Sequence, residues 1–115
     1  MSKWNWILYP ITFIKKTIML LKVESNLRLS PIEFAKLDPG DHVKVSAQCS
    51  DGVVEHFWVH LSDVNQVDGS MSGYVDNDLK FTDDHGYKIN DYIEFNYEHV
   101  ESYLQRDIQE IINKL

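Results

Sequence analysis

The chain is short of cysteine, of basic side chains and of long apolar runs. Its 115 residues include a single cysteine, Cys49, so no disulfide can form within the chain. Lone thiols persist mostly in reducing compartments, and we therefore predict a cytoplasmic protein. Residues 25–115 carry 7 basic and 17 acidic side chains. This excess of acidic side chains argues against nucleic-acid binding. It suits a basic protein partner, or it serves solubility alone.

The sequence also lacks the patterns that usually carry catalysis. It has no glycine-rich phosphate loop and no serine nucleophile elbow. Cys49 could act as a nucleophile with His42 or His56 as its base, but it falls on the inward side of a predicted strand and is interpreted as a core residue. His56 and His60 lie two pleats apart, roughly 13–14 Å, which is too far for one metal ion. We therefore predict a protein that is not an enzyme and that has no metal site or cofactor.

Residues 1–24 are predicted to form an amphipathic helical segment that does not cross a membrane. A membrane span needs about 20 apolar residues, whereas Lys15 and Lys16 interrupt this run. The helix could pack on the domain's own core, form a homodimer seam or dock a partner. Trp4, Trp6 and the lysines would also suit a helix lying on a membrane surface. Its apolar stripe has a 4-3-4-3 spacing and consists of Ile7, Ile11, Ile14, Ile18 and Leu21.

Residues 25–115 are predicted to form one α+β domain. A capping box begins a short helix at Ser30, and Asp38-Pro39-Gly40 ends it. A second capping box at Ser102 predicts a carboxy-terminal helix with an apolar stripe of Leu104, Ile108, Ile111 and Leu115. Between them, apolar alternation predicts four antiparallel strands, over about residues 43–49, 54–64, 71–75 and 92–97. The predicted fold is a small bent antiparallel sheet, close to an SH3-like barrel, flanked by amino-terminal and carboxy-terminal helices.

The second predicted strand offers the strongest candidate binding surface. Phe57 and its alternate neighbours are predicted to face the core, which turns His56, Trp58 and His60 outward. If the terminal helices leave this face uncovered, it has the aromatic character of an interface hot spot. Gly73, within the third strand, predicts a bulge or a close backbone approach. Polar residues of the connection after the third strand complete the predicted contact set: Asp76, Asn77, Asp78, Asp83 and Asp84. Acidic runs of this kind are usually solvated loops.

Residues 41–100 resemble domain-of-unknown-function family 2314, a group of small, mostly bacterial domains. The resemblance rests on Glu55 with Phe57-Trp58-Val59, on Gly73 with Asn77-Asp78, and on Asp91 with Ile93 and Phe95. Two positions depart from the family pattern. Leu79 stands where proline is common, and Asn90 stands where glycine is common, although asparagine tolerates left-handed backbone geometry. The family has no settled activity, so the resemblance implies a bacterial domain without assigning catalytic residues.

These features together predict a non-catalytic protein-binding domain. More specifically, we predict an immunity protein that binds and neutralises a cognate toxin, because acidic inhibitors often occupy basic clefts by charge complementarity. Two alternatives remain open. One is a small-ligand-binding or enzymatic domain with His56, Trp58 and Asn77 around a pocket. The other is a module that associates with a membrane surface through residues 1–24.

Overall fold

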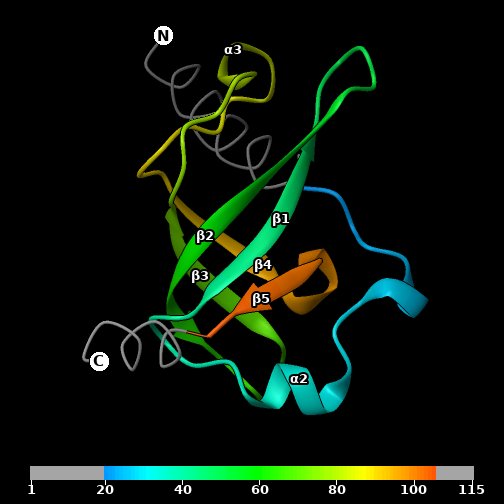
Figure 1. The fold of residues 1–115 in the computed structure, drawn as a ribbon, viewed down its shortest axis with the longest axis vertical. Coiled ribbons are helices and arrows are strands. Elements are labelled where there is room, and N and C mark those ends of the chain that lie inside the picture. Colours follow the sequence, from blue (N-terminus) through cyan, green and yellow to red (C-terminus); the bar gives the residue numbers. More distant parts are fainter. Residues whose placement is uncertain (1–19, 106–115) are drawn as a thin grey trace, which may run out of the picture.

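A five-stranded antiparallel sheet dominates the computed structural model, which describes residues 20–105 (Figure 1). The strand order is β4-β3-β2-β1-β5, so the last strand lies beside the first. The predicted small α+β domain with an antiparallel sheet is confirmed, but with five strands rather than four and with short helices. The elements are the 3-10 helix η1 (Ser25–Leu27), α2 (Pro31–Ala35), β1 (His42–Gln48), β2 (Val54–Val64), β3 (Ser70–Val75), α3 (Thr82–His85), β4 (Tyr92–Asn96), the 3-10 helix η2 (Tyr97–His99) and β5 (Ser102–Leu104).

Helix α2 begins at the predicted capping box. The Ser30 side chain accepts a hydrogen bond from the Glu33 backbone N–H at 3.2 Å, and the Glu33 carboxylate accepts one from the Ser30 N–H at 2.9 Å. Phe34, on this helix, packs against Tyr97 with ring centroids 5.4 Å apart. The helix is followed by Leu37, which is buried. The capping box therefore starts a short element that covers one end of the core.

The core lies against one face of the sheet, as the alternation of β1 and β2 predicts. Every second side chain on these strands points inward, and those at the centre are almost completely buried: Val43, Val45, Ala47, Phe57, Val59 and Leu61. Cys49 is also buried, which confirms its interpretation as a core residue. Burial raises the pKa of the Cys49 thiol, and the nearby charges of Asp84, Asp51 and Glu55 raise it further. The thiol is thus held in its protonated form.

Gly73 provides the close backbone approach that its place in a strand predicts. A Cβ atom at this position would lie 2.2 Å from the backbone oxygen of His60, a distance that no side chain can adopt. The β2–β3 register also shifts between Leu61 and Asp63, which places the predicted bulge on the partner strand. Beyond this point, the register sets His60 directly opposite Tyr74.

The predicted helix start at Ser102 is wrong, because Ser102–Leu104 form strand β5. These residues pair with β1 in antiparallel register, with Val43 opposite Tyr103. An unpaired edge of β1 would leave backbone N–H and C=O groups without partners, and β5 supplies them. Tyr103 packs against the core, whereas Leu104 is 53% exposed. The remaining members of the predicted helical stripe, Ile108, Ile111 and Leu115, lie outside the described residues.

The described part of the amino-terminal segment runs beside the sheet in an extended conformation. Leu20 forms a β-bridge with Ala47, and the Leu21 N–H donates a 2.9 Å hydrogen bond to the Ser46 carbonyl. Leu21 is therefore not helical. The other members of the predicted dimer stripe, Ile7, Ile11, Ile14 and Ile18, lie outside the described residues. Within residues 20–105, no helix combines the length and apolarity needed to cross a bilayer.

Candidate functional site

Four ring side chains cross the outer face of the sheet in one line. The strand register places His42 opposite His60, His60 opposite Tyr74, and Tyr74 opposite Tyr92. Because directly paired residues of antiparallel strands point to the same face, all four rings project together. The two histidine rings meet edge to face at 4.8 Å, and the two tyrosine rings are 5.3 Å apart. We call this set the ring row: His42, His60, Tyr74 and Tyr92.

Three of the four side chains of the ring row are open to solvent, and His42 is half-buried. Tyr74 is 48% exposed and Tyr92 is 52% exposed, and His60 is also exposed. Trp58 lies one pleat away on the same face and is half-buried. Its indole is overlain by Lys44, whose Nζ is 5.7 Å from the ring centroid. The predicted outward orientation of Trp58 and His60 is therefore what the structure shows, and the register extends the face to two tyrosines.

Asn77 fixes the end of β3 against β2. Its side-chain oxygen accepts a 2.7 Å hydrogen bond from the Trp58 N–H, and the Asp76 N–H donates to the Trp58 carbonyl at 2.9 Å. The Asn77 amide also donates to the Asp78 carbonyl. Through these bonds, Asn77 holds Asp76 at the edge of the ring row.

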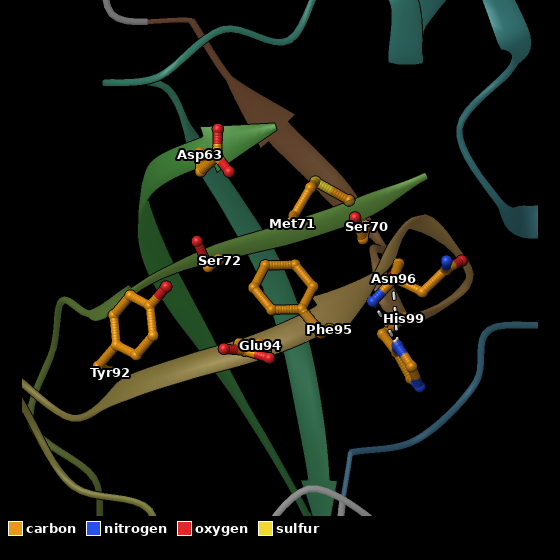
Figure 2. Close-up of a pocket in the computed structure, with 9 residues that line it drawn as sticks. All are labelled: Asp63, Ser70, Met71, Ser72, Tyr92, Glu94, Phe95, Asn96 and His99. Carbon is orange, nitrogen blue, oxygen red and sulfur yellow. Dashed lines mark hydrogen bonds between the residues drawn. The ribbon is translucent and has the colours of Figure 1, made fainter. Parts of the chain in front are cut away.

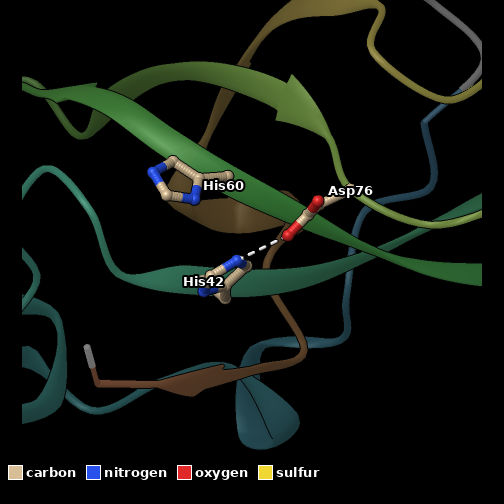
Figure 3. A group of neighbouring side chains, drawn as sticks. All are labelled: His42, His60 and Asp76. Atoms are coloured by element: carbon tan, nitrogen blue, oxygen red, sulfur yellow. Dashed lines mark hydrogen bonds and ion pairs between the residues drawn. The ribbon is translucent and has the colours of Figure 1, made fainter. Parts of the chain in front are cut away.

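Asp76 lies beside the two histidines of the ring row (Figure 3). Its Oδ2 lies 2.7 Å from Nε2 of His42, and one ligand atom from each of His42, His60 and Asp76 lies within 4.8 Å of the other two. The three side chains come from β1, β2 and the segment after β3. Sequence spacing separates His42 from His60 by 18 positions, so only the strand register reveals that they are neighbours.

His56 belongs to a different part of the surface. Its Nδ1 lies 2.7 Å from the Glu101 carboxylate. It lines a hollow of about 550 Å³ together with residues 21–24, Leu27, Ser46, Val54 and Glu101. Trp58 and Asn77 do not line this hollow.

The acidic residues of the predicted contact set divide into bonded and open side chains. The Asp84 carboxylate accepts hydrogen bonds from the hydroxyl and the N–H of Ser50 at 2.7 and 2.8 Å. These two bonds lower the pKa of Asp84. Asp78 and Asp83 are exposed. Asp84 therefore joins α3 to the β1–β2 turn, while Asp78 and Asp83 remain available on the surface.

Sequence reasoning missed a buried polar contact behind the outer face. His85 is 1% exposed, and its Nε2 lies 2.8 Å from the Glu55 carboxylate. The Tyr87 N–H donates to Nδ1 of the same ring, so Nδ1 is unprotonated and Nε2 donates to Glu55. Glu55 also accepts from the N–H groups of Lys80 and Phe81. We call this arrangement the Glu55 bridge. No local motif signals a partner 30 residues away.

A hollow of about 480 Å³ lies next to the ring row (Figure 2). It shares Tyr92 with the row and carries the carboxylates of Asp63 and Glu94. His99 closes one end, where its Nδ1 accepts a hydrogen bond from the Asn96 N–H. Burial lowers the pKa of His99, so its neutral form is favoured. The aromatic surface therefore continues into a recess with an acidic rim: Asp63, Ser70, Met71, Ser72, Tyr92, Glu94, Phe95, Asn96 and His99.

No protein family model matches the chain, and no curated protein or solved structure was found to be similar. The resemblance to family 2314 therefore remains a prediction, and the function must be argued from the geometry of the outer face.

Proposed function

We propose that the protein is a non-catalytic protein-binding domain that uses the outer face of its sheet. The observation that carries this proposal is the exposed ring row. Large rigid rings bury much area on binding and lose little conformational freedom, which is why tyrosine and tryptophan are enriched at interface hot spots. Tyr74 and Tyr92 are about half exposed, side by side and next to a recess. A partner that covers them would gain contact area without rearranging the sheet.

The charges around the ring row support a basic partner. Asp76 stands at one end of the row, and Asp63 and Glu94 line the recess beside Tyr92. Complementary fields speed encounter and select the orientation of docking. We therefore propose, as the specific form of this function, an immunity protein that masks a basic toxin. The resemblance to family 2314 supports a bacterial setting for such a pair.

The detailed fold and the location form part of the same proposal. β1 to β4 form a meander, and β5 returns beside β1 after the 3-10 turn η2. A strongly twisted sheet of this order can curl towards closure, which supports an SH3-like half-open barrel. The buried free thiol of Cys49 fits a reducing compartment, and we propose a cytoplasmic location.

Comparative affinity capture tests the proposal. The wild-type chain, the double variant Tyr74→Ala/Tyr92→Ala and the control Val67→Ala are immobilised and exposed to lysate of the source cells. Val67 is 97% exposed in the β2–β3 turn and lies outside the ring row. We expect one basic protein to be retained by wild type and control, and to fall by about tenfold or more on the double variant. Identical sets of retained proteins on all three surfaces would refute the proposal.

A further inference from the structure

We propose that His42, His60 and Asp76 form a binding site for a divalent transition-metal ion, with zinc as the ion that fits best. Two imidazoles and one carboxylate supply the nitrogen and oxygen ligands that zinc takes in proteins. One such atom from each residue lies within 4.8 Å of the other two (Figure 3). Two of its three ligands belong to the ring row, but the site is argued from its own geometry and does not rest on the proposed protein-binding function.

The backbone holds the three side chains in place. His42 and His60 are direct partners in the β1–β2 ladder, so their separation is fixed by the sheet. Asp76 is anchored one residue before Asn77, because its own N–H and the Asn77 side chain both bond to the backbone of Trp58. Ligands on rigid elements need little reorganisation when an ion binds.

The distances suit an ion after a small adjustment. Zinc bonds of about 2.0–2.2 Å in a tetrahedron place ligand atoms roughly 3.3–3.6 Å apart. Nε2 of His42 and Oδ2 of Asp76 are 2.7 Å apart and would separate slightly as the ion replaces their hydrogen bond. Among the described residues, the ring nitrogens of His60 have no hydrogen-bond partner, so this ring is free to turn towards the ion.

The ligand set also selects the class of metal. Magnesium and calcium prefer an all-oxygen shell, whereas imidazole suits zinc, copper, nickel and cobalt. The side chains of His42 and Asp76 are 27% and 51% exposed, so an ion reaches them from solvent. Three protein ligands leave a fourth tetrahedral position for water or for a donor group from another molecule.

Titration of the untagged full-length chain with zinc chloride tests this site. Isothermal titration calorimetry should show one ion per chain, and His60→Ala and His42→Ala should each weaken its affinity by about tenfold or more. The matched control is His56→Ala, a histidine of the same strand and face that bonds to Glu101 instead. It should bind zinc within about threefold of wild type, because it lies outside the ligand set.

Cobalt provides a second readout that identifies the ligands. Cobalt(II) bound by nitrogen and oxygen should give visible absorption without a strong sulfur charge-transfer band. The His42→Ala variant should lose this visible absorption. All variants are on the outer face, and circular dichroism with thermal melting verifies that they fold. Equal zinc affinity for wild type and His60→Ala, no binding by wild type, or a sulfur band from Cys49 would each overturn the site.

Discussion

At the scale of single residues, Glu55 shows how a charged side chain becomes part of the interior. Its carboxylate accepts three hydrogen bonds, from the His85 ring and from the N–H groups of Lys80 and Phe81. Burial alone would raise the pKa of Glu55, but these hydrogen bonds outweigh it, and the pKa is lowered. The ionised form is therefore the one that ties the connection between β3 and β4 to β2.

We expect Glu55→Gln to destabilise the fold by about 2 kcal/mol, because hydrogen bonds to a buried charged group contribute roughly 1.5–3 kcal/mol. Glutamine retains one acceptor oxygen and turns an amide donor towards groups that are themselves donors. Urea unfolding at neutral pH measures the change. Glu94→Gln, on the exposed rim of the recess, is the matched control and should stay within about 0.5 kcal/mol of wild type. Equal stability of the two variants would contradict the Glu55 bridge.

The residues of the outer face were only partly predictable from the sequence. Alternation within β2 is a local property, so it correctly turns Phe57 inward and His60 outward. Register between strands is not local. The neighbours of His60 are His42 and Tyr74, and both depend on pairings that the sequence pattern does not fix. For this reason the predicted set lacked the two tyrosines, and the metal prediction considered His56 instead of His42.

At the scale of elements, a capping-box pattern correctly predicted a helix only where other start and stop residues supported it. The box at Ser30 is supported by Pro31 in the first turn and by Asp38-Pro39-Gly40 at the end, and it forms α2. The similar pattern at Ser102 has no such support, and the open edge of β1 recruits these residues as β5. Helix α3 was missed for a related reason, since it is a four-residue turn inside a polar connection.

The β5 assignment makes a prediction opposite to that of a carboxy-terminal helix. In β5 the Tyr103 side chain packs on the core and Leu104 is exposed, whereas the helical stripe would bury Leu104. We therefore expect Tyr103→Ala to cost about 2 kcal/mol and Leu104→Ala less than about 0.5 kcal/mol. Urea denaturation of the two variants measures both values. A larger loss for Leu104→Ala would restore the helical interpretation.

At the scale of the whole molecule, hydrogen bonds lower the pKa values of several acidic side chains. Glu33, Asp68 and Asp84 are surface carboxylates whose pKa values are lowered by bonds to serine side chains and backbone N–H groups. Glu55, whose side chain is 10% exposed, adds a largely buried example. In the unfolded chain these groups would titrate near 4.5 for Glu and 3.8 for Asp. Folding therefore favours their ionised forms, although the net charge of −7 also creates self-repulsion.

The direction of the acid response follows from these pKa values. Lowered carboxyl pKa values stabilise the fold fully above about pH 4.5. This stabilisation is lost progressively as the pH falls from that value through the lower pKa values of the folded chain, because the unfolded chain binds more protons in this range. His99 acts in the same direction from its ordinary value of 6.5 downward, since burial lowers its pKa. As the pH falls towards the sequence pI of about 5.0, the loss of net negative charge relieves self-repulsion and opposes the His99 effect, whereas below the pI the growing positive charge adds to the acid destabilisation. Salt at about 0.15 M screens this repulsion, so the proton-linked losses should dominate.

We therefore expect the free energy of unfolding to decline from about pH 6.5 and to fall more steeply below about pH 4.5. Urea denaturation between pH 3 and pH 7 at constant salt measures this profile. Glu55→Gln removes one of the linked carboxyls, so its profile should be flatter below pH 4.5. Glu94→Gln, which removes a carboxylate from the exposed rim of the recess, is the control and should keep the wild-type slope. Stability that does not fall below pH 4.5, or that falls equally in wild type and Glu55→Gln, would contradict the hydrogen-bonded carboxylates as the source of the acid response.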